Sequence, residues 1–170
     1  GHQSREWRNR IGIVLQSSAD AGDLTVLETI DHFSGYYSNP RKVDEVIHAV
    51  GLVEKEKALI RNLSGGQRRR LDVALGIIGS PEILFLDEPS RSLDPTATNQ
   101  LHDLIGQLQE RKQVTIFLIT HDLVEAEKLC QRVAVMHEGR VQVVGEPRAL
   151  RYQLQQRLRY VIRVGVGATA

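Results

Sequence analysis

Two short segments of this chain, residues 63–67 and 83–88, carry the groups best placed for chemistry. In the first, two consecutive glycines follow Ser64 where a helix is expected to begin, so uncovered backbone N–H groups meet the positive end of the helix dipole. In the second, an apolar run ends in two carboxylates, Asp87 and Glu88. The first segment therefore predicts an anion site, and the second predicts a strand that presents two acids to a ligand.

The second segment needs a buried strand behind its carboxylates. Residues 83–86 are all apolar, as expected for a strand covered on both faces of a sheet. Ligands of open α/β sheets lie beyond the carboxyl ends of the strands. For residues 63–67 alone, a helix N-cap with a glycine turn is the simpler interpretation. The carboxylates that follow in the next strand favour a ligand site instead.

Three further residues follow expected strand or helix boundaries. Gln16 closes one apolar run, and His121 follows another. Asp94 precedes Pro95, which is the pairing of an N-cap residue with a proline at the first helical position. Together with the two segments above, and in this order, they resemble the Q-loop, signature, Walker B, D-loop and switch motifs of ATP-binding cassette (ABC) ATPases.

This resemblance implies a role for each residue. Asp87 would hold Mg²⁺ through water, because Mg²⁺ keeps several waters and takes few protein carboxylates. Glu88 would act as the base that polarises the attacking water, and His121 would hold Glu88 and the γ-phosphate of ATP. Gln16 would touch both metal and water. Asp94 would contact a partner subunit, a role that is compatible with simple helix capping.

The signature residues are implied to serve the nucleotide of a second subunit, because cassettes of this family pair head to tail. They are Ser64, Gly65, Gly66 and Gln67. The implied partners are a second nucleotide-binding domain, in a homodimer or heterodimer, and a membrane subunit of a transporter. The expected location is cytoplasmic, at the inner face of the membrane.

The 170 residues contain no G-x-x-x-x-G-K-[ST] run, the loop whose amides, lysine and hydroxyl hold phosphates and Mg²⁺. In the family this loop precedes the Q-loop by several tens of residues, whereas residues 1–15 are all that precede Gln16 here. The sequence is therefore interpreted as a nucleotide-binding domain without its N-terminal part. The complete domain is expected to hydrolyse ATP with Mg²⁺, and this chain alone is expected to be inactive.

The pattern of elements predicts an α/β fold, and the resemblance implies a partial P-loop NTPase (ABC ATPase) core with a mostly parallel sheet and an inserted α-helical subdomain. Residues 1–23 and 81–147 are assigned to the ATPase core, with a hairpin turn expected at Glu138, Gly139 and Arg140. Residues 24–80 read as helices and form the signature subdomain. Residues 148–170, an amphipathic stretch followed by an alternating strand, are assigned to the start of a C-terminal extension.

Composition fits a globular piece in a reducing compartment. The net charge of +1 gives no drive toward nucleic acid or anionic membrane, and a single cysteine excludes an internal disulfide. No apolar stretch approaches the length of a membrane span. The basic cluster in the signature helix is expected to be solvated or to face phosphate; it comprises Arg68, Arg69 and Arg70. The other histidines lack ligand spacing and are expected to be surface or packing residues.

Three classes of function remain open. The first is the ATPase subunit of a membrane transporter, and residues 63–71 look most like those of drug or antibiotic exporters. The second is a DNA-repair or chromosome-structure ATPase, which would carry long coiled coils between Q-loop and signature; residues 17–62 contain no heptads. The third is a non-catalytic binding or regulatory fragment, which the missing phosphate loop favours. The transported substrate is not encoded here, because membrane domains select it.

Overall fold

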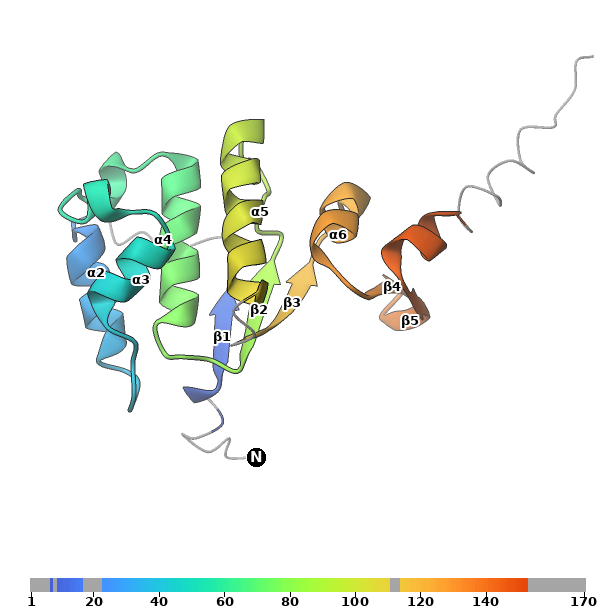
Figure 1. The fold of residues 1–170 in the computed structure, drawn as a ribbon, viewed down its shortest axis with the longest axis horizontal. Coiled ribbons are helices and arrows are strands. Elements are labelled where there is room, and N and C mark those ends of the chain that lie inside the picture. The colour runs from blue at the N-terminus through green and yellow to red at the C-terminus, as the bar shows by residue number, and fades with distance from the viewer. Residues whose placement is uncertain (1–6, 8, 17–22, 111–113, 153–170) are drawn as a thin grey trace, which may run out of the picture. The chain divides into compact units, whose positions relative to one another are not determined.

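The computed structural model describes residues 7, 9–16, 23–110 and 114–152 (Figure 1). The chain divides into two compact units, Gly1–His121 and Asp122–Ala170. The first unit contains a parallel sheet with helices packed against it, and the second contains a hairpin with a short helix. The predicted strand at residues 160–164, and the amphipathic stretch beyond Tyr152, lie outside the described residues.

The sheet of the first unit has three parallel strands in the order β1-β2-β3. They are β1 (Ile11–Val14), β2 (Ile83–Asp87) and β3 (Thr115–Ile119). Val14 pairs with Leu86, and Leu86 pairs with Leu118, so the carboxyl ends of all three strands reach the same edge. The α/β prediction with a parallel sheet is confirmed, and the order brings the segments before Gln16, Asp87 and His121 side by side.

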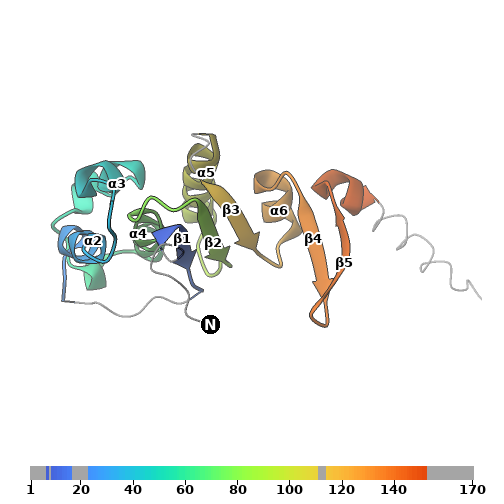
Figure 2. The same ribbon diagram turned by 90° about the horizontal axis from the view of Figure 1, so that it is seen from below.

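One face of the sheet is covered by helix α4 (Gly65–Ile77), which lies alongside α5 (Pro95–Glu110) in both views (Figures 1 and 2). Two glycines allow the close approach of α4 to the sheet: a Cβ on Gly12 would overlap the carbonyl of Gly76, and a Cβ on Gly76 would meet Val14 and Leu84. On the opposite face, no described element of the first unit covers Ile13, which is 60% exposed.

The helical region between β1 and β2 packs around α4 (Figure 1). Its elements are α2 (Val26–Ser34), α3 (Val43–Ala49), and the 3-10 turns Val53–Lys55 and Ile60–Asn62. Helix α2 begins at a capping box in which Thr25 and Glu28 satisfy each other's backbone N–H groups. Its apolar stripe is buried against α3 and α4, as amphipathic spacing requires; the buried residues here include Val26, Ile30, Val46, Ile47 and Leu71.

The second unit contains α6 (Leu123–Leu129) and an antiparallel hairpin of β4 (Val133–His137) and β5 (Arg140–Gly145). The predicted hairpin turn is present but shorter than expected: Glu138 and Gly139 have φ of 49° and 73°, as a two-residue hairpin connection requires, and Arg140 already belongs to β5. A helical turn follows at residues 147–152. Among the described residues of the whole chain, no helix combines the length and apolar character needed to cross a bilayer.

Candidate functional site

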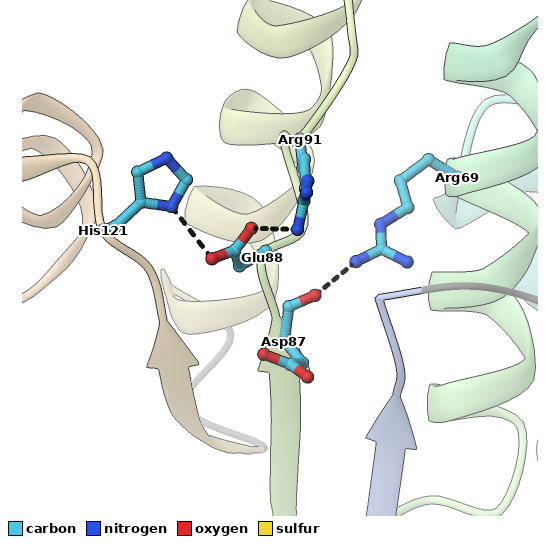
Figure 3. A network of polar contacts seen from close by, with 5 residues as sticks. All are labelled: Arg69, Asp87, Glu88, Arg91 and His121. Atoms are coloured by element: carbon cyan, nitrogen blue, oxygen red, sulfur yellow. Dashed lines mark hydrogen bonds and ion pairs between the residues drawn. The ribbon is translucent and has the colours of Figure 1, made fainter.

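Glu88 lies immediately beyond the end of β2 in an unusual backbone conformation. Its φ is +42°, in the left-handed region that costs a non-glycine residue about 1–2 kcal/mol. Its backbone N–H donates to the carbonyl oxygen of Ile119 on β3 at 2.8 Å. This bond and the left-handed turn direct the Glu88 side chain toward the end of β3 (Figure 3).

Two cationic or titratable side chains meet the Glu88 carboxylate from opposite sides (Figure 3). His121 Nδ1 lies 2.9 Å from one oxygen, and Arg91 Nη1 lies 3.3 Å from the other. The Glu88 side chain is 21% exposed, whereas His121 is 78% exposed. The structure therefore joins Glu88 and His121, which the motif order had only suggested. The contact of Arg91 with Glu88 was not predicted, because nothing in residues 90–92 indicates that the loop returns to Glu88.

Arg69 contradicts the expectation that the basic cluster is solvated or faces phosphate. The residue is 7% exposed. Its guanidinium donates to three backbone carbonyls: Nη1 to Leu15 at 2.6 Å, Nη2 to Asp87 at 2.8 Å, and Nε to Pro89 at 2.9 Å. Asp72, one turn further along α4, lies 3.6 Å from Nη1 and balances the charge. The helical spacing of Arg69 from buried Val73 was the available signal.

Arg70 points elsewhere, into the helical region. Its Nη1 donates to the Gly51 carbonyl at 3.3 Å, and partial burial lowers the pKa of its guanidinium. Arg68 also turns that way and donates to the Ile60 carbonyl at 3.2 Å. Arg69 therefore has different surroundings from its two neighbours, because each step along a helix rotates the side chain by about 100°.

Gln16 lies two residues beyond β1 and is exposed. The register pairs Val14 with Leu86, so the chain beyond β1 runs beside Asp87 at the same edge of the sheet. The carbonyl of Leu15, just before Gln16, is one of the three that Arg69 holds. The backbone next to Gln16 and the backbone of Asp87 are thus connected through a common partner.

The signature residues form the N-terminus of α4, as predicted. Ser64 is the N-cap, with its Oγ accepting from the Gln67 backbone N–H at 3.3 Å, while Gln67 Oε1 accepts from the Ser64 N–H at 3.0 Å. This capping box satisfies two of the helix's free N–H groups. The simpler N-cap interpretation is therefore part of the structure, and the N–H groups near Gly65 and Gly66 remain available for an anion.

The signature helix packs directly against the start of α5. A Cβ built on Gly66 would lie 2.7 Å from the Ala97 Cβ, so only glycine fits without a shift. Asp94 caps α5, since its Oδ1 accepts from the Ala97 backbone N–H at 2.9 Å. The capping alternative for Asp94 is confirmed. The loop before it bends at Ser92, whose φ is +61°.

The donor set at the sheet edge fits Mg²⁺ only as a partly hydrated ion. In the portion of the chain that the structure describes, no three His, Cys, Asp or Glu side chains gather as a metal cage. Asp87 is half-buried at the end of β2 and offers a carboxylate beside the edge where Gln16 emerges. One carboxylate and one amide oxygen, completed by water and phosphate oxygens, match the way Mg²⁺ is usually held.

Residues 2–91 of this chain match the family described as ABC transporter, which is more than half of its length. The chain therefore belongs to the ABC transporter family. It is 37% identical over 150 residues to the methionine import ATP-binding protein MetN 3 of Bacillus cereus, covering 85% of this chain. It is equally similar, at 37% over 151 residues and 86% coverage, to the methionine import ATP-binding protein MetN of Geobacillus kaustophilus.

A solved structure of the same family has the same fold. CbiO1 from Clostridium perfringens, described as part of the ABC transporter complex cbiONQ, superimposes with a TM-score of 0.78 at 27% identity and covers 92% of this chain. The chain spans 65% of that protein and 44% of each of the two methionine import proteins.

Proposed function

We propose that this chain supplies the hydrolytic and signature half of an ATP-binding subunit that drives an ABC transporter. The observation that carries this proposal is the contact between Glu88 and His121 at the carboxyl edge of the sheet, 2.9 Å between Oε1 and Nδ1. An ATPase needs a base held close to the attacking water and a group that senses the γ-phosphate. This pair, next to Asp87, provides both.

Each site residue takes a role consistent with its position. Asp87 would hold Mg²⁺ together with Gln16, and the ion would supply charge neutralisation at the phosphates. Glu88 accepts a proton from, or polarises, the attacking water, and His121 keeps its carboxylate oriented. Asp94 faces a partner subunit from the start of α5. ATP would be shared between two subunits.

The signature helix completes the site of the opposite subunit in this proposal. Its N-terminus offers backbone N–H groups and the positive end of a 13-residue helix to a phosphate. We propose that residues 24–80 form the signature subdomain and that residues 1–23 and 81–147 form the ATPase core, with a C-terminal extension beginning at residue 148. A second nucleotide-binding subunit and a membrane subunit are the proposed partners, with the chain at the cytoplasmic face.

The direction of transport is proposed to be import. The residues of the signature helix, taken alone, look most like those of a drug or antibiotic exporter. The relatives described above are named methionine import proteins, and this favours uptake over export. The transported solute is left to the membrane subunit.

The test is ATP turnover in a fusion that places a segment carrying a G-x-x-x-x-G-K-[ST] phosphate loop before Gly1. We expect Mg²⁺-dependent hydrolysis that Glu88→Gln lowers at least about 10²-fold, while ATP binding persists. Glu82→Gln is the matched control, because Glu82 precedes β2 just as Glu88 follows it, and its partner is Arg10 at 2.6 Å. Turnover that survives Glu88→Gln as well as it survives Glu82→Gln would refute the proposed role of Glu88.

A further inference from the structure

Arg69 holds three backbone carbonyls that come from two different segments of the chain. Two of them, Asp87 and Pro89, lie directly before and after Glu88, and the third, Leu15, precedes Gln16. All three bonds are 2.6–2.9 Å long, which is the range of charge-assisted hydrogen bonds. A single buried guanidinium on the signature helix therefore holds the backbone on both sides of Glu88 and beside Gln16; Figure 3 shows the bond to Asp87.

The backbone of Glu88 needs such a restraint. Its φ of +42° is unfavourable for a side chain with a Cβ, and conformations of this kind persist only where the surroundings over-determine them. On one side the Glu88 N–H is fixed to Ile119 of β3. On the other side, Arg69 fixes the carbonyls of Asp87 and Pro89. Without Arg69 the residue is free to relax toward an ordinary φ, which would turn its side chain away from His121.

We propose that Arg69 is a positioning residue: it holds Glu88 in its left-handed conformation facing His121, and it ties the Glu88 loop and the end of β1 to the signature helix α4. The proposal rests on the proposed function for its catalytic consequence. Any displacement of α4 is transmitted through this guanidinium to Glu88, since a rigid planar group bonded at three points allows little independent movement.

Arginine is required here by geometry as well as by charge. Three N–H donors in a planar fork reach three carbonyls at once, whereas the single ammonium nitrogen of lysine cannot reach all three. Asp72 lies 3.6 Å from Nη1 and supplies the counter-charge, so the buried cation is paired. Arg69→Lys therefore keeps the positive charge facing Asp72 and removes the set of three hydrogen bonds to backbone carbonyls. The variant separates the effect of the charge from the effect of the hydrogen bonds.

The first experiment uses the 170-residue chain itself and follows backbone amide hydrogen exchange. In Arg69→Gln and Arg69→Lys we expect the amides of Glu88 and Arg91 to exchange about tenfold faster or more, with amides in the middle of α5 unchanged. Arg68→Gln is the matched control, because Arg68 lies on the same helix and donates to the Ile60 carbonyl in the helical region. In that variant the amides of the Glu88 loop should exchange as in the wild type.

Uniform acceleration throughout the first unit in the Arg69 variants would overturn the proposal, because it would indicate loss of global stability alone. Unchanged exchange at Glu88 and Arg91 would overturn it as well. The exchange measurement does not depend on ATP turnover. It therefore tests whether Arg69 restrains the Glu88 backbone even where the fusion shows no hydrolysis and the proposed function fails.

The second experiment measures the catalytic consequence in the active fusion. A positioning role predicts a kcat lowered by about 10²-fold in Arg69→Gln, with the KM for ATP changed little, because a small misplacement of a reacting group has that effect on rate. Arg69→Lys should recover less than a tenth of the lost rate, and Arg68→Gln should keep it all. A fusion that hydrolyses ATP at the wild-type rate after Arg69→Gln would overturn the positioning role and leave the proposed function standing.

Discussion

The two signature glycines are expected to respond in opposite ways to the same added methyl group. A Cβ on Gly66 would lie 2.7 Å from Ala97 Cβ, whereas a Cβ on Gly65 would lie 3.8 Å from Leu93 Cδ2. Carbon atoms pack best at about 3.5–4.0 Å, so Gly66→Ala requires α4 and α5 to separate by roughly 1 Å. Gly65→Ala makes an ordinary van der Waals contact.

The magnitudes follow from this difference. Overpacking lowers the free energy of unfolding by about 1–3 kcal/mol, and replacing a helical glycine by alanine raises it by about 0.5–1 kcal/mol. We expect the free energy of unfolding to fall by about 1–2 kcal/mol in Gly66→Ala and to rise by about 0.5–1 kcal/mol in Gly65→Ala. Each kcal/mol corresponds to a Tm change of about 2–4 °C for a chain of this size.

The assay is thermal unfolding followed by circular dichroism, with a double-mutant cycle as the decisive control. Ala97→Gly removes the methyl group that Gly66→Ala would strike, so the double variant should be more stable than the sum of the single variants by about 1 kcal/mol or more. Additive effects, or a Gly66→Ala variant as stable as Gly65→Ala, would refute the claim that the signature helix packs directly on the start of α5.

Three further predictions follow from other parts of the structure. Ser92→Gly should raise the free energy of unfolding, measured by urea denaturation, by about 1 kcal/mol, because φ is +61° at Ser92. A lower free energy of unfolding would contradict that conformation. Hydrogen bonds from Thr25, first from its backbone N–H and then from its hydroxyl, lower the pKa of Glu28 from 4.5. The free energy of unfolding of the wild type should therefore exceed that of Glu28→Ala fully above pH 4.5, and the difference should disappear as pH falls through the lowered pKa of Glu28. A difference that persists in acid would refute this. The sheet face exposing Ile13 and Phe117, at 60% and 51%, should cause concentration-dependent association in light scattering that Phe117→Lys reduces, and a strictly monomeric wild type would contradict it.

The parts of the fold that depend on local pattern were predictable. The apolar run of β2 and the glycine-rich start of α4 specify a buried strand and a capped helix, because burial and capping act within a few residues of sequence. The turn at Glu138 and Gly139 was predictable for the same reason. These elements place Asp87 at a strand end and Ser64 at a helix N-cap without any knowledge of tertiary contacts.

The arrangement around Glu88 could not be predicted in the same way. Its left-handed backbone depends on a hydrogen bond to Ile119, a residue of another strand, and its contact with Arg91 depends on how the loop returns. The prediction for Arg69 was wrong for a different reason. Three consecutive arginines suggest a solvated face, but the 3.6-residue period places the middle one on the buried stripe, where backbone carbonyls satisfy its charge.

The most direct test of the account asks whether the signature of this chain completes a nucleotide site in trans. The fusion carrying Ser64→Arg keeps its phosphate loop and loses its own signature, so it should hydrolyse ATP no faster than background, and so should the 170-residue chain alone. Adding the wild-type chain to that fusion should restore Mg²⁺-dependent turnover, and adding the chain with Ser64→Arg should not. Absence of turnover in the wild-type mixture, with binding of the two proteins demonstrated, would contradict a working signature helix in this chain.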